Sequence, residues 1–244
     1  MTKKVAIFGD SVMRGVIYDD KKKKYTFSKA IDWKKIERVL DIDIDNHAKM
    51  GATIKDGKKR LDKYLANQPE AETIIIEYGG NDCDFDWDYV SQKKSKNHQP
   101  KVSPDVFKET LLIMIQQIRD KGIRPMLMTL PTLDAKKYFT WITSNGRNAE
   151  NILYFLGDVA HIYRFHELYN LAIMEVSMET HVDVIDIRKV FLEHGTLDEL
   201  ICEDGIHPSP YGEKLIVNDI IKKYKTMSTV VKSRLYNQPI LTAC

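Results

Sequence analysis

A serine, a histidine, an aspartate and an asparagine stand in short motifs spread over most of the chain. Ser11 ends the sequence Gly-Asp-Ser, Asn81 lies in Gly-Gly-Asn-Asp, and Asp204 and His207 lie in Asp-Gly-Ile-His-Pro. A serine hydroxyl is a weak nucleophile until a neutral imidazole accepts its proton. The imidazole needs a carboxylate that fixes its tautomer and orientation. Ser11, His207 and Asp204 supply these groups and predict nucleophilic catalysis by serine.

The spacing of the acid and the histidine favours a tight turn. Two residues separate Asp204 from His207, and one of them is glycine. Pro208 disfavours helical backbone at His207 and holds it in an extended or turn conformation. Such a turn lets the carboxylate bond one ring nitrogen while the other ring nitrogen faces Ser11.

Hydrogen-bond donors for a negatively charged intermediate occur in the same set of motifs. The side-chain amide of Asn81 and the backbone N–H groups of Ser11 and Gly51 are the candidates for an oxyanion hole. Taken alone, a Gly-Asp-Ser sequence after a strand also fits an ordinary helix cap. The catalytic interpretation depends on all the motifs lying at the ends of predicted elements.

Strands and helices alternate along the chain. Apolar or alternating runs predict strands at 5–8, 41–47, 73–78, 125–130 and 182–187. Helical periodicity predicts helices at 30–40, 53–67 and 105–121, a long helix opening at 157–158 and a last one from 209–210. This order indicates an α/β protein, a three-layer α/β/α domain spanning 1–244 with a five-stranded, mainly parallel sheet. Parallel strands end at one edge of the sheet, so distant motifs can converge there.

Two segments, 83–104 and 132–148, show no clear period and are expected to be irregular insertions. Long loops of this kind tend to be functional. The lysine run at 21–24 predicts a further, solvated loop. The candidate substrate-binding residues, most of them from the two insertions, are Asp10, Phe85, Trp87, Tyr138 and Trp141.

Aromatic residues alternate with acids just after Asn81, in Asp-Phe-Asp-Trp-Asp-Tyr at 84–89. Aromatic faces beside carboxylates suit a polyol, which offers C–H faces for packing and hydroxyl groups for hydrogen bonds. We therefore expect a short acyl group, such as acetyl, on a polar alcohol such as a sugar. A long fatty chain would need a continuous apolar channel, of which this stretch gives no sign.

Composition excludes several classes of function. A net charge of +2 is too small to indicate binding to nucleic acid or an anionic membrane. The three cysteines are far apart and odd in number, which indicates no disulfide framework. Neither a secretory apolar segment nor an apolar run of membrane-spanning length is present. These features predict a cytoplasmic protein without a nucleic-acid or membrane partner, and they leave the oligomeric state open.

Competing motifs are incomplete. The Gly-X-Ser-X-Gly elbow is absent because Met13 occupies its last position. A His-Glu pair begins at His166, but the second histidine of a zinc-protease helix is missing. We expect His161 and His166 on a solvated or partly buried helix face, and Cys83 as a packing residue. No dinucleotide, nucleoside-triphosphate or zinc motif is present, so no metal or cofactor is expected.

The chain resembles the SGNH, or GDSL, family of esterases and lipases. The resemblance rests on Gly-Asp-Ser ending at Ser11, on Gly51, on Gly-Gly-Asn-Asp around Asn81 and on Asp-Gly-Ile-His-Pro from Asp204, in the family's order. The first block continues with valine in place of leucine, which concerns packing behind the serine. The resemblance implies a flavodoxin-like sheet, Ser11 as nucleophile, His207 as base, Asp204 as its orienting acid, and an oxyanion hole from Ser11, Gly51 and Asn81.

The expected function is that of a serine hydrolase that cleaves carboxylic esters through an acyl-enzyme, on a small-molecule or carbohydrate ester. Several alternatives remain open at this stage. The same triad suits a lipid-directed esterase, a thioesterase or an acyltransferase. A catalytically idle flavodoxin-like module that binds an acylated or phosphorylated ligand at the same sheet edge is the alternative from another class.

Overall fold

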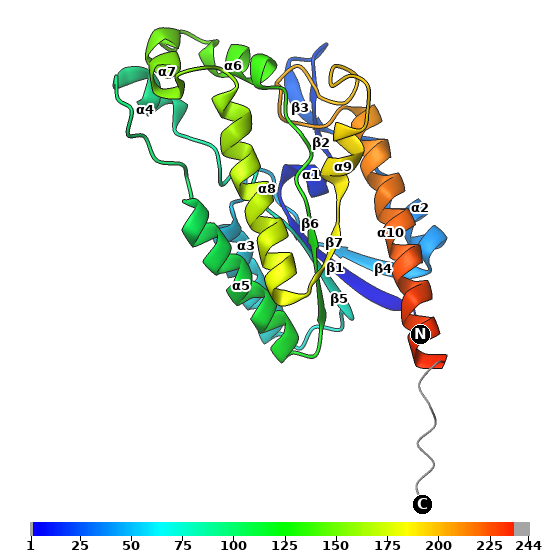
Figure 1. Cartoon of the computed structure of the whole chain (residues 1–244). Coiled ribbons are helices and arrows are strands. Elements are labelled where there is room, and N and C mark those ends of the chain that lie inside the picture. The colour runs from blue at the N-terminus through cyan, green and yellow to red at the C-terminus, as the bar shows by residue number, and fades with distance from the viewer. Residues whose placement is uncertain (1, 237–244) are drawn as a thin grey trace, which may run out of the picture.

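A sheet of five parallel strands forms the centre of the molecule (Figure 1). The computed structural model describes the backbone of residues 2–236 and the side chains of residues 2–226. The strands are β1 (Lys3–Gly9), β4 (Ile42–Asn46), β5 (Thr73–Glu77), β6 (Arg124–Met128) and β7 (Asp183–Ile185), in the spatial order β4-β1-β5-β6-β7. All four strand pairings are parallel. This is the flavodoxin-like order, and it confirms the predicted fold class.

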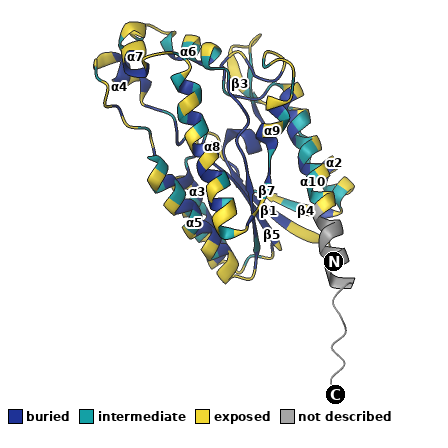
Figure 2. Ribbon diagram, viewed as in Figure 1, coloured by how far each residue is buried: buried dark blue, intermediate teal, exposed yellow. Residues whose placement is uncertain are grey.

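The central strands are buried on both faces because their apolar residues run without interruption. In β1, Ala6 and Phe8 join one hydrophobic cluster, whereas Val5 and Ile7 join a second cluster on the opposite face. Successive side chains of a strand point to opposite faces, so a continuous apolar run supplies both cores. The three isoleucines of β5 divide in the same way. Figure 2 shows the middle of the sheet as buried, whereas the edge strand β4 is partly exposed.

Helices cover both faces of the sheet. On one face, α3 (Ile54–Ala66), α5 (Pro104–Asp120) and α8 (His161–Thr180) contribute to the first cluster. On the other face, α1 (Ser11–Arg14), α2 (Trp33–Leu40), α9 (Ile187–Leu192) and α10 (Pro210–Tyr236) pack against the second. Figure 1 shows the resulting three layers. Among the described helices, none has both the length and the apolar character needed to cross a membrane.

The two segments expected to be irregular contain helices, so that expectation was wrong. Helix α4 (Trp87–Gln92) lies in the first segment, α6 (Ala135–Thr143) lies in the second, and α7 (Ala149–Leu156) follows directly. Their apolar side chains form a third cluster with one another, together with residues of the first turns of α8. The helices are short, and their apolar faces meet only in the folded molecule.

The segment around the lysine run is a β-hairpin, which the sequence did not predict. Strands β2 (Val16–Asp19) and β3 (Lys24–Phe27) pair antiparallel, and only the turn between them matches the expected solvated loop. Tyr18 and Tyr25 face each other across the hairpin, with ring centroids 5.4 Å apart. The hairpin begins directly after α1, beside the carboxyl edge of the sheet.

Candidate active site

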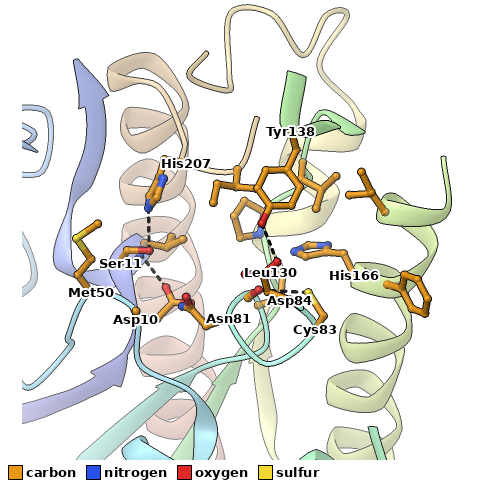
Figure 3. Close-up of a pocket in the computed structure, with 18 of the residues that line it drawn as sticks. Asp10, Ser11, Met50, Asn81, Cys83, Asp84, Leu130, Tyr138, His166 and His207 are labelled. Atoms are coloured by element: carbon orange, nitrogen blue, oxygen red, sulfur yellow. Dashed lines mark hydrogen bonds between the residues drawn. The ribbon is translucent and has the colours of Figure 1, made fainter. Parts of the chain in front are cut away.

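Ser11, His207 and Asp204 lie in hydrogen-bond contact at the carboxyl edge of the sheet (Figure 3). Nε2 of His207 is 3.0 Å from Oγ of Ser11, and Nδ1 is 2.5 Å from Oδ2 of Asp204. Because a carboxylate only accepts, Nδ1 carries the proton and Nε2 is free to accept from the serine. The second carboxylate oxygen accepts from the backbone N–H of His207 at 3.1 Å. Asp204 is fully buried.

The serine occupies the first residue of α1, immediately after β1. Asp10 caps this helix by accepting the N–H of Val12 at 2.9 Å. A side chain on Gly9 would lie 2.9 Å from both Met13 and the carboxylate of Glu77, so glycine is needed where the strand meets the helix. The cap and the tight turn hold Ser11 facing the cavity, as Figure 3 shows.

The Asp204–His207 turn is held from both sides. The N–H of Cys202 donates to the carbonyl of His207 at 2.9 Å, and the N–H of Asp134 donates to the carbonyl of Gly205 at 2.8 Å. Gly205 has a φ of +80°, and a Cβ there would lie 2.3 Å from the backbone nitrogen of Tyr138. The close approach of α6 therefore requires glycine inside the turn.

Gly51 and Asn81 line the same cavity as Ser11. The side-chain amide of Asn81 donates one of its two N–H bonds to Oδ2 of Asp10 at 2.9 Å. Gly51 follows β4 with a φ of +74°, in a loop tied to β1 by the bond from the Lys49 N–H to the Gly9 carbonyl at 3.0 Å. The structure thus brings together all five residues of the predicted triad and oxyanion hole.

Three buried carboxyl groups lie beneath the serine, and only Asp10 among them was predicted as a site residue. Burial raises the pKa of Asp10, and the N–H of Asp10 donates to Glu77 at 3.2 Å. Burial and the charge of Asp10 raise the pKa of Glu77 well above its ordinary value. Glu77 therefore holds a proton more tightly than an ordinary glutamate does. Burial also raises the pKa of Asp82 to about 7, although this carboxyl accepts the N–H of Ile54 at 2.9 Å.

A cavity of about 200 Å³ extends from Ser11 to the N-terminal part of α8. Four of the five predicted substrate-binding residues line it: Asp10, Phe85, Trp87 and Tyr138. Trp141 does not line it and instead packs edge-on against Tyr18, with ring centroids 4.6 Å apart. Most of the other walls are apolar, with Leu130, Leu133, Ile162 and Phe165 among them.

The acids that alternate with aromatic residues have partners within the protein. Asp84 accepts from the Trp87 indole and the Tyr138 hydroxyl, both at 2.7 Å, and pairs with Lys101. Asp86 caps α4, and Asp88 pairs with Arg147 at 2.8 Å. Of these three acids only Asp84 lines the cavity. The alternating acids and aromatic residues at 84–89 therefore have a structural role beside the cavity, and their acids are not free to bind a ligand.

Three further cavity residues escaped the sequence analysis. Tyr25 of the hairpin lies beside His207, with ring centroids 5.1 Å apart, and burial together with Asp204 raises the pKa of its hydroxyl. Met50 lines the mouth near Ser11. His166 is buried and faces the cavity, which corrects the expectation of a solvated or partly buried helix face. No local pattern connects Tyr25 or Met50 to the triad.

Cys83 is buried, and burial raises the pKa of its thiol, as suits a packing residue. Its sulfur donates to the carbonyl of Gly80 at 3.2 Å. Among residues 2–226, no group of three or more histidine, cysteine or acidic side chains is arranged to hold a metal ion.

The parallel sheet with its flanking helices is the fold of an SGNH hydrolase. A family model described as GDSL-like Lipase/Acylhydrolase matches residues 7–215, and the chain belongs to that family. This membership confirms the resemblance seen in the sequence and makes the protein a member of a hydrolase family.

Known relatives extend over nearly the whole chain. A protein of Bacillus subtilis (strain 168) named uncharacterized lipoprotein YqeF is 26% identical over 235 residues, covering 88% of this chain and 87% of the relative. A lipase/acylhydrolase from Enterococcus faecalis has a similar structure, with 23% identity, a TM-score of 0.64 and coverage of 92% and 96%. A catalytic mutant of an acetylxylan esterase from Geobacillus stearothermophilus has 17% identity, a TM-score of 0.62 and coverage of 91% and 94%. Since the first relative is named a lipoprotein, the cytoplasmic location stays a prediction.

Proposed function

We propose that the protein hydrolyses carboxylic esters through an acyl-enzyme formed on Ser11. The observation that carries the proposal is the unbroken set of contacts from Asp204 to His207 at 2.5 Å and from His207 to Ser11 at 3.0 Å, at the edge of a cavity. Each partner has the role that ester cleavage needs: a nucleophile, a base and an acid that orients the base.

Catalysis then proceeds in two halves. Nε2 of His207 takes the hydroxyl proton as Oγ of Ser11 attacks the ester carbonyl, and the buried Asp204 stabilises the imidazolium that forms. The tetrahedral intermediate collapses as His207 gives that proton to the departing alcohol, which leaves an acyl group on Ser11. Water, deprotonated by His207, attacks this acyl group and releases the acid and the free serine.

The intermediate carries a negative oxygen that needs donors in place before the reaction. The backbone N–H groups of Ser11 and Gly51 and the second N–H of the Asn81 amide are the proposed donors. The carboxylate of Asp10 holds the first N–H of that amide, so the side chain is oriented before substrate binds. The raised pKa of Glu77 favours its protonated form, which avoids a second negative charge beside Asp10.

The directions of the substituents on the tetrahedral carbon indicate that the acyl group lies in the cavity. The departing oxygen must face His207 and the negative oxygen must face Gly51 and Asn81, so the acyl carbon points in the remaining direction, into the cavity. We propose a short acyl group on a polar alcohol. The acyl length is tested by kcat/KM for aryl esters from acetyl to octanoyl. A steady rise toward octanoyl, as a lipid-directed esterase would give, contradicts the short-chain proposal.

The mechanism is tested with Ser11→Ala and with a serine-directed aryl phosphonate. We expect turnover of an aryl acetate to disappear, circular dichroism to stay unchanged, and the phosphonate to add its mass to the peptide that contains Ser11. Ser91→Ala is the matched control, because Ser91 is equally buried but lies on α4 outside the cavity. More than about a tenth of the activity remaining in Ser11→Ala would contradict the mechanism. An idle binding module would give neither turnover nor labelling in the wild type.

A further inference from the structure

The wall of the cavity opposite the serine contains a buried histidine. His166 belongs to α8 and is 5% exposed. Figure 3 shows it across the cavity from Ser11 and His207. Both ends of the cavity therefore carry an imidazole, but only His207 contacts the serine.

The tautomer of His166 follows from its neighbour. Nη1 of Arg188 lies 3.4 Å from Nδ1 of His166. A guanidinium has only donors, so Nδ1 must accept and the ring proton must sit on Nε2. Burial and the charge of Arg188 also lower the pKa of His166 to about 3, which keeps the ring neutral.

Arg188 is itself fixed in place. It is 3% exposed, its Nη1 donates to the carbonyl of Pro131 at 3.3 Å, and its other terminal nitrogen pairs with Glu167. Glu167 balances the charge of the guanidinium. His166 is thus oriented by a rigid partner, as a ligand-binding group requires.

Nε2–H of His166 is left without an acceptor. The only hydrogen bond of this side chain within the described part of the chain is the one at Nδ1. Asp84, a polar neighbour on the cavity wall, already accepts two hydrogen bonds at Oδ1 and pairs with Lys101 through Oδ2. His166 lines the cavity, so its free donor can meet a ligand there. A site with such a donor discriminates against ligands that lack the matching acceptor.

We propose that Nε2–H of His166 forms a subsite for an oxygen atom of the acyl chain, so that the enzyme prefers acyl groups with a hydroxyl, keto or ether oxygen beyond the reacting carbonyl. This inference rests on the proposed function, because the chain that enters the cavity is the acyl chain only if Ser11 attacks the ester carbonyl. The apolar walls favour the carbon atoms of the chain, and His166 selects the position of the oxygen.

The kinetic test uses pairs of p-nitrophenyl esters that differ by one oxygen in place of one methylene. The pairs are 3-methoxypropanoate with pentanoate, 4-methoxybutanoate with hexanoate, and 5-methoxypentanoate with heptanoate. Wild type is compared with three variants. His166→Gln keeps an N–H donor near the position of Nε2. His166→Asn keeps an acceptor for Arg188 but lacks that reach, and His166→Phe has neither group.

For at least one pair, we expect the ratio of kcat/KM for the ether ester over the alkyl ester to be about threefold to tenfold higher in wild type than in His166→Phe. His166→Gln should keep most of this preference and His166→Asn should lose it. Equal ratios in all four proteins would overturn the inference and leave the esterase proposal standing. A preference that depends on His166 but appears only when the oxygen is moved to the alcohol would also overturn it.

A binding measurement tests the subsite without turnover. In wild-type protein labelled with ¹⁵N-histidine, the Nε2–H signal of His166 should shift on addition of 4-methoxybutanamide more than on addition of hexanamide, with a Kd about threefold lower for the ether. Amides of this kind replace the cleavable ester. If no ester is cleaved but the amides are distinguished, the proposed function fails and the subsite remains. If neither amide shifts the signal, the subsite is wrong.

Discussion

Adding a single methyl group at Gly205 should disturb both the stability of the protein and the geometry of the catalytic turn. Gly205 lies between Asp204 and His207 with a φ of +80°, and its N–H donates to the carbonyl of Cys202 at 3.0 Å. A Cβ at this position would meet the backbone nitrogen of Tyr138 at 2.3 Å. The obstacle is helix backbone, so it cannot be relieved by a rotamer change in a flexible side chain.

Two costs add in Gly205→Ala. A left-handed conformation costs an alanine about 1–2 kcal/mol more than a glycine. Restoring an ordinary contact with α6 requires the turn to move by about 1 Å, and overpacking of this kind costs about 1–3 kcal/mol. A shift of about 1 Å can also lower catalysis by about 10²-fold. We expect a loss of about 2–5 kcal/mol in the free energy of unfolding and a fall of at least tenfold in kcat/KM.

Gly146→Ala is the matched control, because Gly146 has a φ of +81° and an added Cβ would meet no atom within 4 Å. The variant should lose only about 1–2 kcal/mol in the free energy of unfolding, the cost of alanine in a left-handed conformation, and should keep its kcat/KM. Urea unfolding gives the stability difference, and hydrolysis of an aryl acetate at a temperature where both variants are folded gives the activity. Equal losses of stability and activity in the two variants would refute the argument from close packing.

Two further predictions concern the groups beneath the serine. Asn81→Ala should lower kcat by about 10²–10³ with a smaller change in KM, measured by steady-state kinetics; a raised KM with unchanged kcat would mean that Asn81 binds the ground state. Glu77→Gln should become more stable relative to wild type as the pH rises above about 4.5, by up to about 1.4 kcal/mol per pH unit. The reason is that folded Glu77 keeps a proton that the unfolded chain releases above its ordinary pKa of 4.5. A pH-independent difference in urea unfolding would show that folding does not raise the pKa of Glu77.

The sequence predicted the part of the fold that depends on local patterns. The apolar run of β1 and the isoleucines of β5 favour strands buried on both faces, and both strands lie in the interior of the sheet. Because parallel strands end at one edge, the meeting of Ser11 and Asn81 followed from topology, whereas His207 lies in the turn before α10. No distance between these residues was needed for the prediction.

The features that were missed depend on contacts between distant segments. Helices α4 and α6 have six and nine residues, too short for a clear period, and their apolar faces pack on each other in the third cluster. Tyr25 contacts His207 only because the β2–β3 hairpin folds back over the sheet edge.

The burial of His166, in contrast, could have been predicted from its spacing in the sequence. Ile162, His166, Tyr169 and Ile173 follow one another at intervals of four, three and four, which is the apolar face of a helix. All four are buried.

The sequence motif proposed for binding a polar alcohol is not the part of the site where that alcohol would lie. The acids at Asp84, Asp86 and Asp88 bond to the protein itself, so they do not offer free carboxylates to a sugar. If the acyl group fills the cavity, the alcohol must lie at its mouth, where Tyr25 is 37% exposed and Met50 is 44% exposed. The C–H face of a sugar can pack on the ring of Tyr25, which also lies beside the histidine that must protonate the departing oxygen. In the proposed binding mode, preference for the alcohol would depend on Tyr25 and Met50, and preference for the acyl group on α6 and α8.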